Sequence, residues 1–206
     1  MSGPPRVFIL SPAHCGGERA GLLLREGAAF DLARRVRRSP GAPLGEVFSF
    51  LSGLYFRGKL AYAEAFAAPP PGLAGVYVIT PTEGLRPADD PVDVARLRRF
   101  ASVDIAAGDA RYSRPLRRDA LRLAAAFDTA GEVVLLGSVA TGKYVEPLTE
   151  TLGARLRFPS DFVGRGDMSR GGLLLRCVRE RRELAYVPVA GAPRHGRRPA
   201  RLERSP

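Results

Sequence analysis

Residues 164–170, whose sequence is GRGDMSR, combine glycines with arginine and serine side chains. Arg165 and Arg170 each offer a planar guanidinium that binds phosphate or carboxylate oxygens. Ser169 adds a hydroxyl where we expect a helix to start, and the amide groups of a helix N-terminus favour an anion. We predict that Arg165, Ser169 and Arg170 bind phosphate, and that Asp167 caps the helix.

A second glycine-rich turn, residues 137–143, follows an apolar segment and has the spacing G-x-x-x-x-G-K of a phosphate loop. The next residue is Tyr144, where a nucleoside triphosphatase has the serine or threonine that binds magnesium. We therefore expect a phosphate-binding turn of another kind, with Ser138, Thr141 and Lys143 as its binding residues. A glycine-rich turn without a ligand is the alternative.

Two residues are candidates for proton transfer. His14 lies in a loop directly after the first apolar segment, and an imidazole exchanges protons near neutral pH. Glu83 lies beside a glycine in a comparable turn after a second apolar segment. Two further residues are candidates for ligand binding. These are Arg86, three residues after Glu83, and Ser11, at the start of the loop that contains His14. A purely structural role in a loop is the alternative for each.

The only lysines of the chain, Lys59 and Lys143, each follow a glycine. In a chain that otherwise uses arginine, a compact ammonium at a glycine suggests a point contact with phosphate or a role in proton transfer. We include Lys59 among the binding residues, and chance placement is the alternative.

The net charge of +11 and the pI near 10.7 favour a polyanionic partner. An arginine-rich composition that reflects the genome is the alternative. The two cysteines form neither a disulfide framework nor a zinc spacing with the two histidines, so we expect no metal and no cofactor. No apolar run reaches the length of about 18 residues that a membrane span needs, and no secretion signal is evident, so we expect a cytoplasmic protein without a membrane partner.

The hydrophobic pattern predicts one α/β domain in residues 1–190 and a basic, disordered tail in residues 191–206. Strands are predicted at residues 6–10, 76–80, 132–136, 155–158 and 184–189. A helix with a break at Gly27 is predicted at residues 18–38, and two helices at 43–54 and 59–67 flank a predicted turn at 55–58. A long turn is predicted at residues 80–87. Further helices are predicted at residues 91–100, 115–127 and 143–152, and a last helix follows the glycine-rich segment 164–170 and ends near residue 181.

This alternation predicts a mostly parallel central sheet of about five strands with helices on both faces. Ligands of such sheets bind at the carboxyl ends of the strands. We therefore expect residues 11–17, 80–86, 137–143 and 164–170 to meet there.

Three segments resemble the YaaA family of peroxide-stress, DNA-binding proteins: Ser11-Pro12-Ala13 after the first strand, residues 82–89 with the sequence TEGLRPAD, and residues 165–170. This resemblance implies a compact α/β fold with a basic cleft that binds DNA. The chain departs from the family at His14, where the family has a lysine.

These observations predict a nucleic-acid-binding or nucleotide-binding protein with a basic, glycine-rich cleft that recognises phosphate. DNA is favoured over RNA. If the protein is catalytic, His14 or Glu83 would transfer a proton in a reaction at a base or glycosidic bond. The alternative from another class is a nucleotide-processing or phosphoester-processing enzyme that uses the degenerate phosphate loop at residues 137–143, and a third is a structural module without such a ligand.

Overall fold

The computed structural model describes residues 4–127, 131–140, 142–193, 195–197 and 199. Within these residues, one sheet contains six strands in the order β4-β3-β1-β6-β7-β8. Their bounds are Gly84–Pro87 (β4), Val76–Thr80 (β3), Arg6–Leu10 (β1), Glu132–Leu136 (β6), Leu156–Pro159 (β7) and Tyr186–Pro188 (β8). The four central strands are parallel, and β4 and β8 pair antiparallel at the two edges. The predicted α/β class with a mostly parallel sheet is confirmed.

The central strands β1 and β6 form because their apolar residues, valine and isoleucine among them, are buried on both faces of the sheet. They pair in parallel along their whole length, from Arg6 opposite Glu132 to Leu10 opposite Leu136. Both strands therefore end at the same level. The loops that begin at Ser11 and Gly137 leave the sheet side by side.

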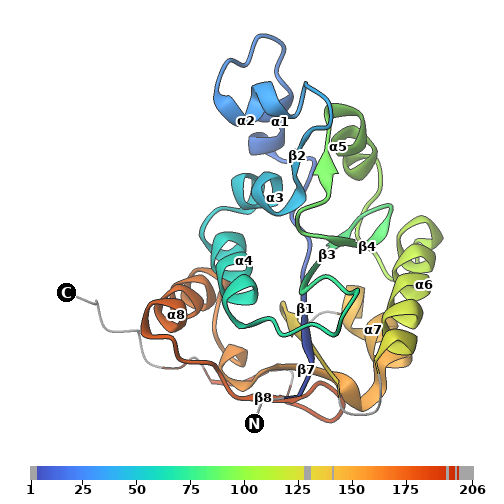
Figure 1. The fold of residues 1–206 in the computed structure, drawn as a ribbon, viewed down its shortest axis with the longest axis vertical. Coiled ribbons are helices and arrows are strands. Elements are labelled where there is room, and N and C mark those ends of the chain that lie inside the picture. The colour runs from blue at the N-terminus through green and yellow to red at the C-terminus, as the bar shows by residue number, and fades with distance from the viewer. Residues whose placement is uncertain (1–3, 128–130, 141, 194, 198, 200–206) are drawn as a thin grey trace.

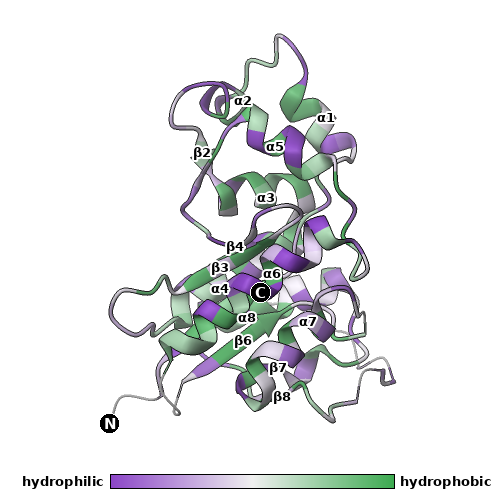
Figure 2. Cartoon of the chain, turned by 90° about the vertical axis from the view of Figure 1, so that its right-hand side faces the viewer, coloured by the Kyte–Doolittle hydropathy of each residue, from purple (hydrophilic) through white to green (hydrophobic). Residues whose placement is uncertain are grey.

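Helices cover both faces of the sheet, as Figure 1 shows. On one face, α4 (Leu54–Phe66) packs against α8 (Asp167–Glu180); on the other, α6 (Ala110–Ala126) packs against α7 (Gly142–Leu152). The strands are hydrophobic where these helices cover them (Figure 2). Short 3₁₀ turns at Gly153–Arg155 and Ser160–Phe162 flank β7.

A smaller group of elements lies beyond the carboxyl ends of the central strands, at the top of Figures 1 and 2. It contains α1 (Glu18–Leu24), α2 (Asp31–Arg35), α3 (Leu44–Ser52) and α5 (Val94–Ala101), and a two-stranded ribbon of β2 (Ala42–Pro43) and β5 (Pro91–Val92). The loop after α5 returns toward the sheet and forms one wall of the site described below.

Several element boundaries differ from the sequence prediction. The break at Gly27, which has a φ of 79°, is confirmed between α1 and α2. The turn predicted at residues 55–58 is wrong, because α4 runs through it and the chain breaks instead at Gly53, with a φ of 67°. The turn predicted at residues 80–87 contains a strand, β4. Helix α6 begins five residues before Pro115, because the Asp109 side chain accepts the Arg111 N–H at 2.9 Å and caps it.

None of the helices in the described part of the chain is long and apolar enough to cross a membrane. Of residues 191–206, for which we predicted disorder, Gly196 and Arg197 lie against Gly164, where an added Cβ would come within 3.0 Å of their carbonyl oxygens. The prediction for the rest of this segment stays a prediction.

Candidate functional site

The sheet has a topological switch point between β1 and β6. The chain leaves β1 to reach β3 on one side, whereas it leaves β6 to reach β7 on the other side. The connecting loops therefore diverge and leave a hollow at this edge of the sheet. A cleft of about 630 Å³ lies there, a volume typical of small-molecule sites.

The cleft is lined by segments far apart in the sequence. Residues 11–16 follow β1, Pro81 follows β3, Ser138, Lys143 and Tyr144 follow β6, Tyr55 comes from α4, and Asp167 from the first turn of α8. A further part of the lining comes from the end of α5 and the loop after it: Phe100, Ala101, Val103, Asp104, Ile105 and Ala106. All four segments that we expected to meet contribute to it, although 80–86 does so only through Pro81 and 164–170 only through Asp167.

Lys59 is buried directly behind the first residue of the cleft, with 2% of its surface exposed. Its Nζ lies 2.7 Å from the Ser11 carbonyl oxygen and 2.8 Å from Ser11 Oγ. It also lies over the rings of Tyr55 and Phe56, at 4.7 and 4.5 Å from their centroids. Burial lowers the pKa of Lys59 to about 7, against the raising effect of Asp167. Lys59 itself does not line the cleft, so Ser11 separates its amine from the ligand space.

The turn after β6 is organised around the hydroxyl of Tyr144. This oxygen accepts the Ser138 N–H at 2.9 Å, while Ser138 Oγ accepts the Ala140 N–H at 3.4 Å. Two amides of the turn are therefore already bonded within it, unlike those of a phosphate loop. Ser138 and Lys143 line the cleft, and Lys143 is exposed. Thr141, the other predicted binding residue of this turn, lies outside the described residues.

The three residues predicted to bind phosphate before and within α8 lie outside the cleft lining. Arg170 is 8% exposed and donates to the Phe162 carbonyl oxygen at 3.2 and 3.0 Å and to Asp167 Oδ1 at 3.3 Å. Arg165 donates to the Asp161 carbonyl oxygen at 3.0 Å and to Ser169 Oγ at 3.3 Å. These side chains hold the loop before α8 in place.

Asp167 has a different position from the one predicted. The N-cap of α8 is Gly166, and no side chain in the described part of the chain caps that helix end, so the prediction that Asp167 is the cap is wrong. Asp167 is the first helical residue and lines the cleft, with 69% of its side chain exposed.

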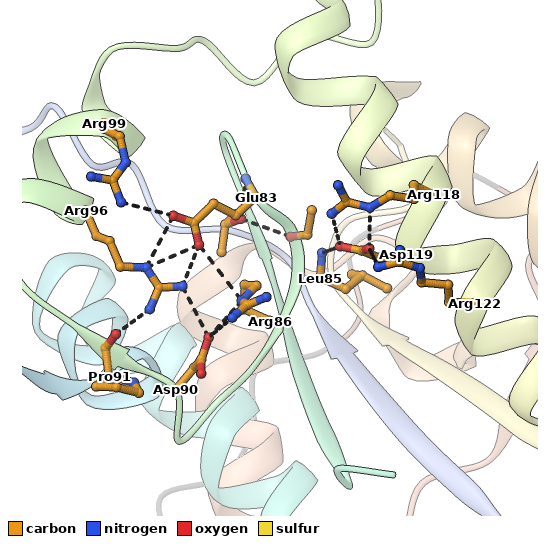
Figure 3. A network of polar contacts seen from close by, with 12 residues as sticks. Glu83, Leu85, Arg86, Asp90, Pro91, Arg96, Arg99, Arg118, Asp119 and Arg122 are labelled. Carbon is orange, nitrogen blue, oxygen red and sulfur yellow. Dashed lines mark hydrogen bonds and ion pairs between the residues drawn. The ribbon is translucent and has the colours of Figure 1, made fainter. Parts of the chain in front are cut away.

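Glu83 and Arg86 lie in a network of ion pairs outside the cleft (Figure 3). The Glu83 carboxylate accepts from Arg96 Nε at 3.2 Å and from Arg99 at 3.5 Å, and Arg86 pairs with Asp90 at 2.7 Å. Arg86 lines a smaller hollow of about 230 Å³ near α6. The structure therefore does not bring Glu83 together with Ser11, His14 and Lys143.

The loop after β1 provides two residues with different environments. His14 lines the cleft and is exposed, with its ring folded over Gly17. Cys15 is buried, and burial raises the pKa of its thiol to about 12. A nucleophile needs the thiolate, so this environment favours a structural role for Cys15 and leaves His14 as the accessible proton-transfer group.

Sequence reasoning missed Tyr55 as part of the site. Tyr55 is 9% exposed, lines the cleft and has a raised phenol pKa because it is buried. The charge of Arg170 lowers this pKa, and the buried Tyr55 hydroxyl lies within reach of the Arg170 guanidinium. The sequence pattern that could have indicated Tyr55 is its spacing of four residues from Lys59, which places both residues on one face of a helix. The prediction of a turn at residues 55–58 concealed it.

In the described residues, no group of three or more histidine, cysteine, aspartate or glutamate side chains is arranged to hold a metal ion. Comparisons of the chain with protein-family models, curated protein sequences and solved structures found no match.

Proposed function

We propose that the protein binds a nucleotide in the switch-point cleft, either free or as one unstacked residue of a nucleic acid. The observation that carries the proposal is that Lys143 and His14 line the same cleft as the apolar residues Phe100 and Ile105. A cation beside a helix N-terminus suits a phosphate, and an apolar wall suits the face of a base.

The charges of the cleft favour a single nucleotide over a long tract of phosphates. Asp104 and Asp167 line it together with Lys143. Carboxylates repel phosphates, but they accept hydrogen bonds from ribose hydroxyls and from the amino groups of bases. The basic residues of the chain would then hold neighbouring phosphates of a strand outside the cleft. The resemblance of three segments to the YaaA family supports DNA as that strand, and the proposal includes a cytoplasmic location.

His14 is the residue that we assign to proton transfer if the bound nucleotide is changed chemically, because it is exposed in the cleft whereas Glu83 is ion-paired outside it. Phosphoester chemistry through residues 137–143 is less well supported. The Tyr144 hydroxyl accepts the hydrogen bond of the Ser138 N–H, so this amide cannot donate to a phosphate in the same arrangement.

Titration calorimetry with the full chain tests the proposal. Nucleosides, nucleoside monophosphates, inorganic phosphate and short single strands of DNA and RNA are compared at two salt concentrations. We expect a nucleoside monophosphate to bind more tightly than either the nucleoside or phosphate. Replacement Lys143→Ala should weaken it about tenfold or more, since one charge-assisted hydrogen bond contributes about 1.5–3 kcal/mol.

The matched control is Arg182→Ala, which removes a positive charge after the far end of α8, where Arg182 is 59% exposed and pairs with Glu180. Equal losses in both variants would assign the effect to net charge and contradict a specific contact at Lys143. The absence of binding by all nucleotides and strands at low salt would refute the proposal.

A further inference from the structure

Ser11 and Lys59 have the spatial arrangement of a nucleophile and its general base: the hydroxyl faces the cleft and the amine lies behind it. Ser11 lines the cleft at the end of β1, and Lys59 lies behind it in the core, with Nζ 2.8 Å from Oγ. Hydrogen-bond contact between a hydroxyl and a buried base is the signature of an activated serine, and serine–lysine pairs are one form of it.

We propose that Ser11 is the nucleophile, and Lys59 the general base, of a hydrolase that cleaves carboxylic esters in this cleft. The inference goes beyond nucleotide binding and does not rest on it.

The contacts of Lys59 suit a neutral amine that acts as a base. Its lone pair can accept the Ser11 hydroxyl proton while one of its N–H groups donates to the Ser11 carbonyl oxygen at 2.7 Å. The carbonyl contact holds the amine beside Oγ, and in the neutral form the lone pair can take the place of the N–H that faces Oγ. Burial favours the neutral form and lowers the pKa of Lys59 to about 7, so that a large fraction is neutral at physiological pH. The faces of the Tyr55 and Phe56 rings act in the opposite direction, because they favour the charged form.

The charged and titratable groups near this pair come from three helices. Asp167 and Arg170 on α8 act on Lys59 with opposite signs, and Tyr55 on α4 places its ring against the amine. Tyr144 on α7 is hydrogen-bonded to the Ser11 side chain. Asp167 is exposed at the cleft, so solvent screens its effect on Lys59. Among the described residues, no carboxylate forms an ion pair with the amine that would keep it charged.

The position of Ser11 in front of Lys59 also decides between two uses of a buried lysine. A lysine that forms a Schiff base must itself meet the substrate carbonyl, but Lys59 does not line the cleft. Tyr55 lines the cleft as well, and its hydroxyl is buried within the protein.

The reaction balances without any other reactant than water. Ser11 Oγ attacks the ester carbon and gives its proton to Lys59 Nζ; the bond to the alcohol oxygen breaks, and that oxygen takes the proton from Lys59. Water then attacks the acyl carbon and gives a proton to Nζ, the bond to Oγ breaks, and Oγ recovers the proton. The products are a carboxylic acid and an alcohol. The apolar wall, which includes Val103 and Ile105, suits the acyl group.

The test is covalent labelling of the full chain with an alkyl fluorophosphonate, in which Oγ bonds to phosphorus, fluoride leaves and Lys59 takes the proton. We expect one adduct, mapped by mass spectrometry to Ser11. The labelling rate should rise with pH through about 7, because only the neutral amine is a base. Hydrolysis of a p-nitrophenyl ester should show the same pH profile.

Variants separate this role from a structural one. Ser11→Ala should abolish labelling, whereas Ser52→Ala, which changes an exposed serine outside the cleft, should label like the wild type. Lys59→Met should slow labelling by about 100-fold or more while circular dichroism remains native. If Lys59→Met does not fold, the pH dependence of the labelling rate of the wild type tests the role of Lys59 instead.

An unlabelled Ser11 in folded protein, a pH-independent labelling rate, or a Lys59→Met rate equal to that of the wild type would each overturn the inference. These outcomes differ from those of the nucleotide titrations, since labelling of Ser11 requires no nucleotide.

Discussion

Gly58 of α4 and Gly171 of α8 lie in backbone contact where the two helices cross. A Cβ on Gly58 would lie 2.7 Å from the Gly171 carbonyl oxygen, and a Cβ on Gly171 would lie 2.9 Å from the Cα of Tyr55. The next residue after Gly58 is Lys59, and the residue before Gly171 is Arg170. The close approach of the two backbones therefore sets the position of the buried amine relative to α8.

Substitution of either glycine should disturb this crossing. We expect Gly58→Ala or Gly171→Ala to lower the free energy of unfolding by about 1–3 kcal/mol, because the helices must separate to admit the methyl group. Denaturant unfolding measures the change. In the control Gly21→Ala, also within a helix, the methyl group meets nothing within 4 Å, and alanine should leave stability unchanged or raise it by up to about 1 kcal/mol. Equal effects at the three positions would contradict the close packing.

The buried amine of Lys59 should make stability depend on pH. Below about pH 7 the amine is protonated in both the folded and the unfolded chain; between about 7 and the ordinary value of 10.5, only the unfolded chain binds this proton. The free energy of unfolding should therefore rise with pH in this window, by at most about 1.4 kcal/mol per unit. Urea unfolding of the wild type and of Lys59→Met between about pH 7 and pH 9 gives the difference. Parallel pH dependences would show that Lys59 keeps its charge in the folded chain.

Substitution of Gly137 should displace the nucleophile proposed above. An added Cβ there would lie 2.8 Å from Ser11 Cβ and 3.0 Å from the Tyr144 hydroxyl oxygen. We expect Gly137→Ala to slow labelling of Ser11 about tenfold or more, because a misplaced reactive group reacts slowly. The control Gly108→Ala meets no atom within 4 Å and should label at the wild-type rate. Normal labelling of Gly137→Ala would mean that the pair tolerates the shift.

The two cysteines should resist alkylation in the folded protein. Burial raises the pKa of Cys15 to about 12 and also raises that of Cys177. At about pH 8, the thiolate fraction of Cys15 should fall about 1000-fold below that of the unfolded chain, so iodoacetamide should react correspondingly slowly. Mass spectrometry of alkylated peptides with and without denaturant gives both rates. Rapid modification of native Cys15 would contradict its burial and make it a candidate nucleophile.

The ion-pair network around Glu83 should stabilise the fold without affecting the cleft. Glu83→Gln removes the charge that pairs with Arg96 and Arg99 (Figure 3), and should lower the free energy of unfolding by about 1 kcal/mol, since these pairs are only partly buried. Glu180→Gln, in an exposed pair, should change it by less than about 0.5 kcal/mol. Labelling of Ser11 and nucleotide binding should be unchanged in both. A loss of either in Glu83→Gln would place Glu83 in the function after all.

Much of the fold could be predicted because buried parallel strands have a local signature. The bounds of β1, β3 and β6 agree with the prediction, since each is a short apolar run between breakers. Helix α4 was split wrongly because Gly58 is a helix breaker by local rules, while its role depends on contact with Gly171.

The site was only partly predictable for the same reason. Ser11, His14 and Lys143 follow central strands, so topology alone brings them to one edge. The pairing of Ser11 with Lys59 needs the packing of α4 on the sheet, which no local pattern contains. Arg165 and Arg170 have the composition of an anion site, but main-chain carbonyl oxygens already accept their hydrogen bonds.

The two edge strands of the sheet are short, and each ends in a proline: Pro87 in β4 and Pro188 in β8. Proline offers no N–H to an incoming strand, and a strand of three or four residues gives little length for pairing. Both margins of the sheet thus resist extension by another chain. An α/β protein whose central strands are as apolar as β1 and β6 is thereby protected against edge-to-edge aggregation.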